Sequence, residues 1–297
     1  MIKTRESLGD RVFVALLYTV VLLILIIVMY PLILVLSSSV SRADLVATGQ
    51  VWLLPKGLNI SGYQRVFQDP AIMTGYKNTL FYAVVGTVIN LIVTVPAGYA
   101  LSKRTLPGRG FLTFYFLFIM YFSGGMIPTF LLVKGLGLYN TRMLLVIMGA
   151  FGAYNCIICR TFFSSIPPEL EEAAAIDGCT PLQSFFRIVL PISQALLGVM
   201  VLYFVVGHWN SYFTAMIYTN DPKITPLQLV LRRILILEQS SVDMMSDAAT
   251  DELATRVYLV ELVKYAVIVV SSLPLLMLYP FLQKYFVKGV LIGSLKG

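Results

Sequence analysis

Apolar residues form long uninterrupted runs along this chain, and short polar segments separate the runs. A helix that crosses the hydrocarbon core of a bilayer needs about 20 predominantly apolar residues. Six runs meet or approach that length, and they are Val12–Leu36, Leu80–Leu101, Phe111–Val133, Met143–Ile158, Ile192–Tyr218 and Val257–Phe281. The pattern predicts an all-α fold, namely a polytopic membrane protein with six transmembrane helices.

Basic residues in the short flanking segments predict the orientation of these helices, because lysine and arginine are enriched on the cytoplasmic side. They precede the first run, occupy the short segment from Ser102 to Gly110, and follow the last run: Lys3, Arg5, Arg11, Lys103, Arg104, Arg109, Lys284, Lys288 and Lys296. With six spans, both termini are therefore expected in the cytoplasm.

Composition supports the membrane assignment and excludes several other classes. Of 297 residues, 58% are hydrophobic and 12% are charged, about half the charged fraction of soluble domains. The positive-inside pattern accounts for the net charge of +7, so we expect no nucleic-acid partner. Cys156, Cys159 and Cys179 with the single His208 make neither a disulfide framework nor a usual zinc site, and we expect no metal.

The segment between the fourth and fifth runs predicts two helices on the cytoplasmic side. Ser164 and Ser165 are candidate caps, and the acidic residues from Glu169 onward favour the positive end of a first helix. Gly178 is suited to the left-handed conformation that ends a helix. The sequence Thr180-Pro181-Leu182-Gln183 is a capping box that starts the second helix, which continues to Pro191.

The helix pair has three possible interpretations. A helix that lies on lipid favours basic residues on its polar face, whereas the first helix here is acidic. A DNA-reading helix pair needs cationic contacts to phosphates, which this segment lacks. An acidic helix that meets a basic protein partner fits the sequence best.

Several motifs together resemble one family. Glu172-Ala173-Ala174 followed by Gly178 and Ile188-x-Leu190-Pro191 is similar to the EAA signature of binding-protein-dependent ABC importer permeases, in particular the carbohydrate class that includes maltose and alginate systems. Asn78-Thr79-Leu80, Trp209-Asn210 and the tail from Lys288-Gly289 to Lys296-Gly297 resemble the same family. The resemblance implies an ABC type I importer permease fold.

The resemblance also implies a division of the chain. Residues 1–73 would hold the cytoplasmic N-terminus, the first transmembrane helix and an outer loop. Residues 74–283 would form a permease core of five helices, with a coupling helix near 165–178. Residues 284–297 would form a cytoplasmic tail.

The resemblance further implies partners and roles. Two cytoplasmic ATPase subunits would bind ATP and Mg, since this chain has no G-x-x-x-x-G-K-[ST] loop and is expected to bind no cofactor. The other partners would be a second homologous permease, an extracellular or periplasmic solute-binding protein and the bilayer of a bacterial cytoplasmic (inner) membrane. ATPase coupling is expected from Glu169, Glu172, Ala173, Ala174, Asp177 and Gly178, and tail contacts from Lys288, Gly289 and Lys296.

Polar and aromatic residues inside the apolar runs are candidates for the substrate pathway. His208, Trp209, Asn210 and Tyr212 lie in the fifth run, where interhelical hydrogen bonding is the alternative role. Ser123 and Gly124 interrupt the third run. This break could act as a gate beside the pathway, or the glycines could allow close packing of helices.

The expected function is ATP-driven import of oligosaccharides or related sugars by alternating access, and the chain is not expected to be an enzyme. A permease for amino acids or polyamines and a passive channel remain alternatives. An intramembrane enzyme built on His208 and Ser211 is a weaker one, because no orienting carboxylate is near in sequence.

Overall fold

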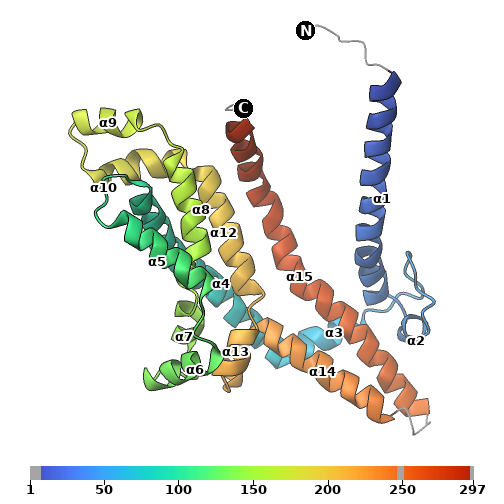
Figure 1. Ribbon diagram of the computed structural model, residues 1–297. Coiled ribbons are helices and arrows are strands. Elements are labelled where there is room, and N and C mark those ends of the chain that lie inside the picture. The colour runs from blue at the N-terminus through green and yellow to red at the C-terminus, as the bar shows by residue number, and fades with distance from the viewer. Residues whose placement is uncertain (1–7, 246–250, 295–297) are drawn as a thin grey trace. The chain divides into compact units, whose positions relative to one another are not determined.

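The computed structural model (Figure 1) describes residues 8–245 and 251–294, and its regular elements there are helices. The chain divides into two compact units. One comprises Met1–Asp69 and Arg233–Leu273, and the other comprises Pro70–Arg232 and Pro274–Gly297. Each unit is described by itself. Two long helices contribute to both, namely α14 (Leu227–Met245) and α15 (Asp251–Ser294).

The first unit is built around a long apolar helix, α1 (Leu8–Ser39), followed by α2 (Ala43–Ala47) and α3 (Ser61–Gln68). The sides of α1 are exposed over most of its length, and only Ser37, Ser38 and Ser39 are buried. The following loop folds back onto this end, where the Ser37 hydroxyl donates to the Leu53 carbonyl at 2.6 Å. An apolar helix with exposed sides is the expected state of a membrane span without its lipid.

An ion pair lies at the start of α2 in this loop. The Arg42 guanidinium donates two hydrogen bonds of 2.6 Å to the Asp44 carboxylate. The hydrogen bonds lower the pKa of Asp44 and raise that of Arg42. Both groups are exposed to solvent, so the pair contributes little to stability.

The second unit is centred on α4 (Pro70–Ser102), against which other helices pack. Its remaining helices are α5 (Arg109–Tyr121), α6 (Met126–Gly135), α7 (Arg142–Ile147), α8 (Ala153–Ser164), α9 (Glu169–Ile176), α10 (Pro181–Ser184), η1 (Phe185–Val189), α11 (Leu190–Ile192), α12 (Gln194–Trp209), α13 (Phe213–Tyr218) and η2 (Pro222–Ile224). The most extensive packing is of α8 and α12 on α4.

Two glycines on α4 permit this close packing. A Cβ atom at Gly98 would lie 2.4 Å from the Cys159 Cβ on α8, and one at Gly86 would lie 2.4 Å from the His208 ring on α12. Small residues at helix crossings are typical of membrane bundles, because van der Waals contact replaces the hydrophobic driving force there. Cys156 and Cys159 are fully buried, consistent with a packing role.

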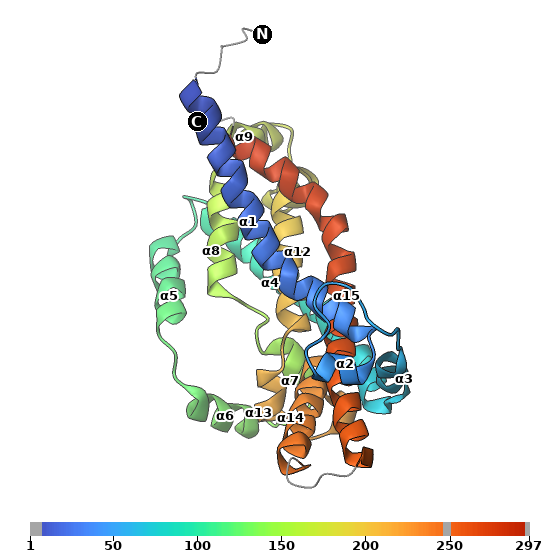
Figure 2. The same ribbon diagram turned by 90° about the vertical axis from the view of Figure 1, so that its right-hand side faces the viewer.

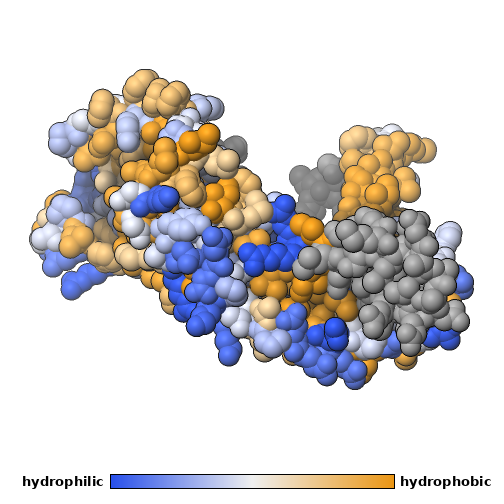
Figure 3. Space-filling model, turned by 90° about the horizontal axis from the view of Figure 1, so that it is seen from below, coloured by the Kyte–Doolittle hydropathy of each residue, from blue (hydrophilic) through white to orange (hydrophobic). Residues whose placement is uncertain are grey.

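The length and composition of the helices fit a membrane protein. Among the described residues, three helices are long and apolar enough to cross a bilayer, and up to five if each bent pair is counted as one span. The space-filling view shows broad hydrophobic patches beside separate hydrophilic ones (Figure 3). Asn78 and Tyr99 lie 21 positions apart on α4 (99 − 78). At 1.5 Å per residue, this stretch of helix is about 32 Å long, which matches a hydrocarbon core about 30 Å thick.

Three of the six predicted spans are not single straight helices. The run Met143–Ile158 is not one continuous helix, because the chain is interrupted between α7 and α8, where Gly149 has a φ of 118°. In Phe111–Val133, α5 and α6 meet at 111°, with an extended linker that is visible in Figure 2. In Ile192–Tyr218, the helix begins at Gln194 after a bend of 82° and is broken again at residues 210–212.

Candidate functional site

The predicted helix pair is present at one end of the second unit, beyond the end of α8 (Figure 1). The first helix, α9, carries Glu169, Glu171 and Glu172 in its first turn, where carboxylates interact favourably with the helix dipole. The prediction that Ser164 or Ser165 caps it is wrong. Pro168 holds the cap position without a side-chain bond, and the Ser165 hydroxyl donates to the Phe162 carbonyl at the end of α8.

The end of α9 is fixed by backbone geometry, as predicted for Gly178. Its φ is 80°, in the left-handed region that glycine adopts without steric cost. The Gly178 amide donates to the Ala175 carbonyl at 3.1 Å, and the Cys179 amide donates to the Ala174 carbonyl at 2.9 Å. This pair of bonds is the Schellman motif, and Asp177 is the residue at the helix end.

The two faces of α9 have different environments. Ala174 is buried and Glu171 is half-buried against the rest of the unit. Glu169, Glu172, Ala173 and Ile176 are exposed. The small Ala174 side chain therefore lets α9 pack closely against the rest of the unit. The outward face presents the carboxylates of Glu169 and Glu172 beside the apolar side chain of Ile176.

Glu171 connects α9 to the end of α4 through an ion pair and a hydrogen bond. Its carboxylate pairs with the Lys103 ammonium and accepts a 3.1 Å hydrogen bond from the Tyr99 hydroxyl. The Lys103 ammonium also lies 4.3 Å from the centre of the Tyr99 ring. This contact was not predicted from the sequence, although two signals were available: a lysine directly after a predicted span and a glutamate in the first turn of α9 to which no role was given.

Tyr99 extends the same contact to other elements. Its ring centre lies 5.6 Å from that of Phe163 on α8 and 4.7 Å from that of Phe185 on η1. One side chain at the end of α4 therefore contacts the ends of α8, α9 and the helix that follows α9. A displacement of α9 would be transmitted to these elements through packed contacts.

The second helix of the pair begins with the predicted capping box. The Gln183 amide donates to the Thr180 hydroxyl at 3.3 Å, and the Thr180 amide donates to the Gln183 side chain at 2.9 Å. The helix continues as η1, a π-helical turn, and α11. It passes Pro191 and bends by 82° at Ser193 into α12.

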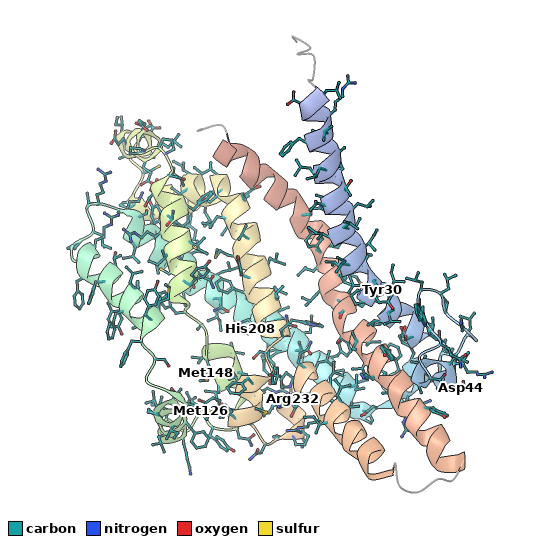
Figure 4. The ribbon with its side chains drawn as sticks, turned by 45° about the vertical axis from the view of Figure 1, so that its right-hand side comes forward. Tyr30, Asp44, Met126, Met148, His208 and Arg232 are labelled. Atoms are coloured by element: carbon teal, nitrogen blue, oxygen red, sulfur yellow. The ribbon has the colours of Figure 1, made fainter. Side chains whose placement is uncertain are left out.

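His208 takes part in a polar contact inside the bundle (Figure 4). Its Nε2 lies 2.7 Å from the Asn90 Oδ1 on α4, and the Asn90 amide nitrogen donates to the Gly149 carbonyl. Because Asn90 presents its oxygen to the ring, His208 Nε2 is the donor. The Asn90 amide thus supplies a hydrogen-bond donor for the Gly149 carbonyl, which has no helical partner in the break between α7 and α8. Asn90 was missed, although a polar residue inside an apolar span was a signal.

The other predicted pathway residues of the fifth run have separate environments. Trp209 is buried and its ring lies 6.2 Å from the ring of Tyr76 on α4. Asn210 and Tyr212 are exposed in the break between α12 and α13. The four residues therefore do not form one surface: His208 and Trp209 pack within the bundle, whereas Asn210 and Tyr212 are accessible.

Ser123 and Gly124 lie in the linker between α5 and α6, and both are exposed. A Cβ atom at Gly124 would have no described atom within 4 Å, so packing of this glycine within the chain is excluded for the described residues. The bend instead depends on Gly125, whose φ is 89°. Its amide donates to the Ser123 hydroxyl at 3.3 Å.

Asn78 and Thr79 have a structural role at the other end of α4. The Asn78 amide nitrogen donates to the carbonyls of Lys223 and Thr225 at 2.9 and 3.0 Å. The Thr79 hydroxyl accepts from the Leu227 amide at 2.8 Å, which caps the start of α14. These contacts fix the segment before α14 to the beginning of α4.

Two groups of predictions remain without structural evidence. Lys288 and Gly289 lie on α15, but their surroundings are outside the part of the chain that the structure describes, and Lys296 is outside the described residues. No cluster of potential metal ligands is found among residues 8–245 and 251–294.

Comparison with known proteins gives consistent matches. Residues 70–292 match the family model described as "Binding-protein-dependent transport system inner membrane component". The chain is 38% identical to the polygalacturonan/rhamnogalacturonan transport system permease protein YtcP of Bacillus subtilis, over 97% of this chain and 99% of the relative. It is 26% identical to the maltodextrin transport system permease protein MdxG of the same organism, over 94% and 95%.

A solved structure matches both sequence and fold. It is the crystal structure of a bacterial ABC transporter involved in the import of the acidic polysaccharide alginate. The matched chain has 36% sequence identity and a TM-score of 0.84, with 96% of this chain and 100% of that chain covered.

Proposed function

The chain belongs to the family of inner membrane components of binding-protein-dependent transport systems, and from that premise we propose how its described residues take part in transport. It is a multi-pass permease of an ABC importer for oligosaccharides or polysaccharides. It is a transmembrane component and not an enzyme. Its family implies an ATPase and a binding protein as partners.

The proposed assembly contains this chain, a second homologous permease, two cytoplasmic ATPase subunits that bind ATP and Mg, and an external solute-binding protein. The proposed location is a bacterial cytoplasmic membrane, with six spans and both termini inside. Three of the six proposed spans are the long apolar helices. The two bent helix pairs supply two more, and α7 with α8 supplies the sixth. Residues 288–297 form a proposed second contact with the ATPase.

The proposed docking surface on the ATPase side is the outward face of α9. Glu169, Glu172 and Ala173 are exposed there, and carboxylates on a helix suit a basic cleft of a partner. The single observation that carries the proposal is the two-sided environment of this helix. One face is fixed to α4 through Glu171, and the other presents acidic groups to the exterior.

The contacts of Glu171 provide the route from the ATPase to the spans. Movement of α9 on ATP-driven closure would pull on Tyr99 and Lys103 at the end of α4, and on α8 and η1 through the aromatic contacts of Tyr99. Such packed elements move as rigid bodies between two arrangements, which is the usual form of alternating access. The linker at Ser123 and Gly124 and the residues from His208 to Tyr212 are the proposed moving parts of the pathway.

Replacement of Glu172 tests the docking surface. Glu172→Lys is expected to insert normally, because the side chain is exposed, but to abolish uptake and reduce copurification of the ATPase. Glu172→Gln, which removes the charge at equal size, should give an intermediate effect and serves as the matched control. Normal uptake by Glu172→Lys would contradict the docking assignment.

A further inference from the structure

Arg232, near the start of α14, is held by uncharged groups. Its guanidinium carbon lies 5.0 Å from the centre of the Tyr212 ring, and its Nη1 contacts the Met216 sulfur. Within the described part of the chain, no carboxylate pairs with it. Figure 4 shows Arg232 below His208, in the region where α12 ends and α14 begins. Among the described residues, the guanidinium therefore has an aromatic ring and a thioether as neighbours and no acidic counter-charge.

The unused donors of Arg232 require an explanation. A guanidinium has five N–H donors in a planar fork, and a thioether sulfur is a weak acceptor for one of them. A guanidinium whose donors are not all used can bind the two oxygens of a carboxylate through parallel hydrogen bonds. The Arg232 side chain is only partly buried, so solvent and a dissolved ligand can reach it.

The neighbouring side chain suits a sugar. Tyr212 lies in the break between α12 and α13 and is 39% exposed. An exposed aromatic ring offers an apolar face to the ring of a sugar, while the guanidinium fork beside it matches the two oxygens of a carboxylate. A sugar that carries a carboxylate would use both groups at once.

Two of the similar proteins are named for acidic polysaccharides. One carries polygalacturonan and rhamnogalacturonan, and another imports the acidic polysaccharide alginate. Uronic acid residues in such polymers bear a carboxylate. We propose that Arg232 and Tyr212 form a subsite in the transport pathway for the carboxylate of an anionic oligosaccharide. This proposal rests on the importer function and adds the substrate class and the residues that select it.

Direct binding to the assembled transporter tests the subsite. The permease pair with its ATPases, without the binding protein, is titrated with trigalacturonate and with its carboxyl-reduced counterpart, which is neutral. Arg232→Gln should weaken binding of trigalacturonate about tenfold, equivalent to roughly 1.4 kcal/mol, and leave the neutral sugar unchanged. Arg232→Lys, which keeps the charge but loses the fork, should retain part of the affinity.

Arg233 supplies the matched control, because it is the next residue of the same helix and is exposed. Arg233→Gln should bind both sugars as the unmodified chain does. An equal loss for both sugars in Arg232→Gln, no loss for either, or no binding of trigalacturonate by the unmodified transporter would each overturn the subsite.

Uptake measurements separate this outcome from failure of the importer function. Proteoliposomes that contain the unmodified transporter and its binding protein should take up an oligosaccharide when ATP is supplied. If they do so while Arg232→Gln binds and transports trigalacturonate normally, the subsite is wrong and the importer assignment stands. If no ATP-dependent uptake of any oligosaccharide occurs, the importer assignment itself is wrong.

Discussion

The ion pair between Lys103 and Glu171 offers a test of how α9 moves the spans. Coupling of α9 to the spans requires that this pair transmit force as well as stabilise the fold. The informative change is charge reversal at each position, Lys103→Glu and Glu171→Lys, followed by the combined exchange. Each single reversal places like charges next to one another, and the exchange restores an attractive pair.

The expected size follows from the exposure of the two side chains, which is 31% for Lys103 and 22% for Glu171. Fully exposed ion pairs contribute up to about 1 kcal/mol, and this pair is partly shielded, so about 1 kcal/mol is a reasonable value for Lys103→Glu. That corresponds to roughly a fivefold change in the population of the attached state. Glu171→Lys should have a larger effect, because it also removes the acceptor for the Tyr99 hydroxyl.

The appropriate assay is the number of sugar molecules transported per ATP hydrolysed in proteoliposomes. Both single reversals should keep the ATPase bound and active but lower this ratio about fivefold or more. The exchange should recover most of the loss in Lys103→Glu, short of the Tyr99 contribution. Unchanged ratios in the single variants, or an exchange no better than either of them, would refute transmission through this pair.

Three other substitutions test the packing and the backbone geometry. Gly98→Ala should lower the stability of the permease by about 1–3 kcal/mol, since its Cβ would lie 2.4 Å from the Cys159 Cβ; thermal unfolding in detergent measures this, and an unchanged midpoint would contradict the close crossing. Gly178→Ala should cost about 1 kcal/mol because φ is 80°, and faster hydrogen exchange at the end of α9 is the expected result. Asn90→Leu should destabilise by about 1–3 kcal/mol by leaving the Gly149 carbonyl unpaired; wild-type stability would show that water or another group replaces the amide.

Local signals in the sequence predicted the helix pair of α9 and α10 well. The capping box at Thr180 and the left-handed turn at Gly178 depend on neighbouring residues, so their chemistry can be read from a short segment. The acidic start of α9 was predicted for the same reason. Its N-terminal cap was not, because Ser165 has an alternative bond to the Phe162 carbonyl.

The broken spans were harder to predict, because an apolar run of residues does not show which groups form hydrogen bonds with its backbone. The interruption at Gly149 is satisfied by Asn90, which is 59 positions away in the chain. The contact of Glu171 with Lys103 is also non-local, and the signature that directed attention to Glu172 gave no reason to examine its neighbour. Tertiary partners of this kind follow from the packing of α4 with other helices, which periodicity alone does not specify.

The most direct test of the account is the position of the outward face of α9. A photoreactive residue is placed at position 172 in the assembled transporter, in inverted membrane vesicles, with Lys103 and Glu171 unchanged. If this face docks on the ATPase, a crosslink to the ATPase subunit should form and its yield should change when ATP is added. A crosslink to lipid alone, or reaction of a cysteine at position 172 with an impermeant reagent from outside intact cells, would contradict this docking.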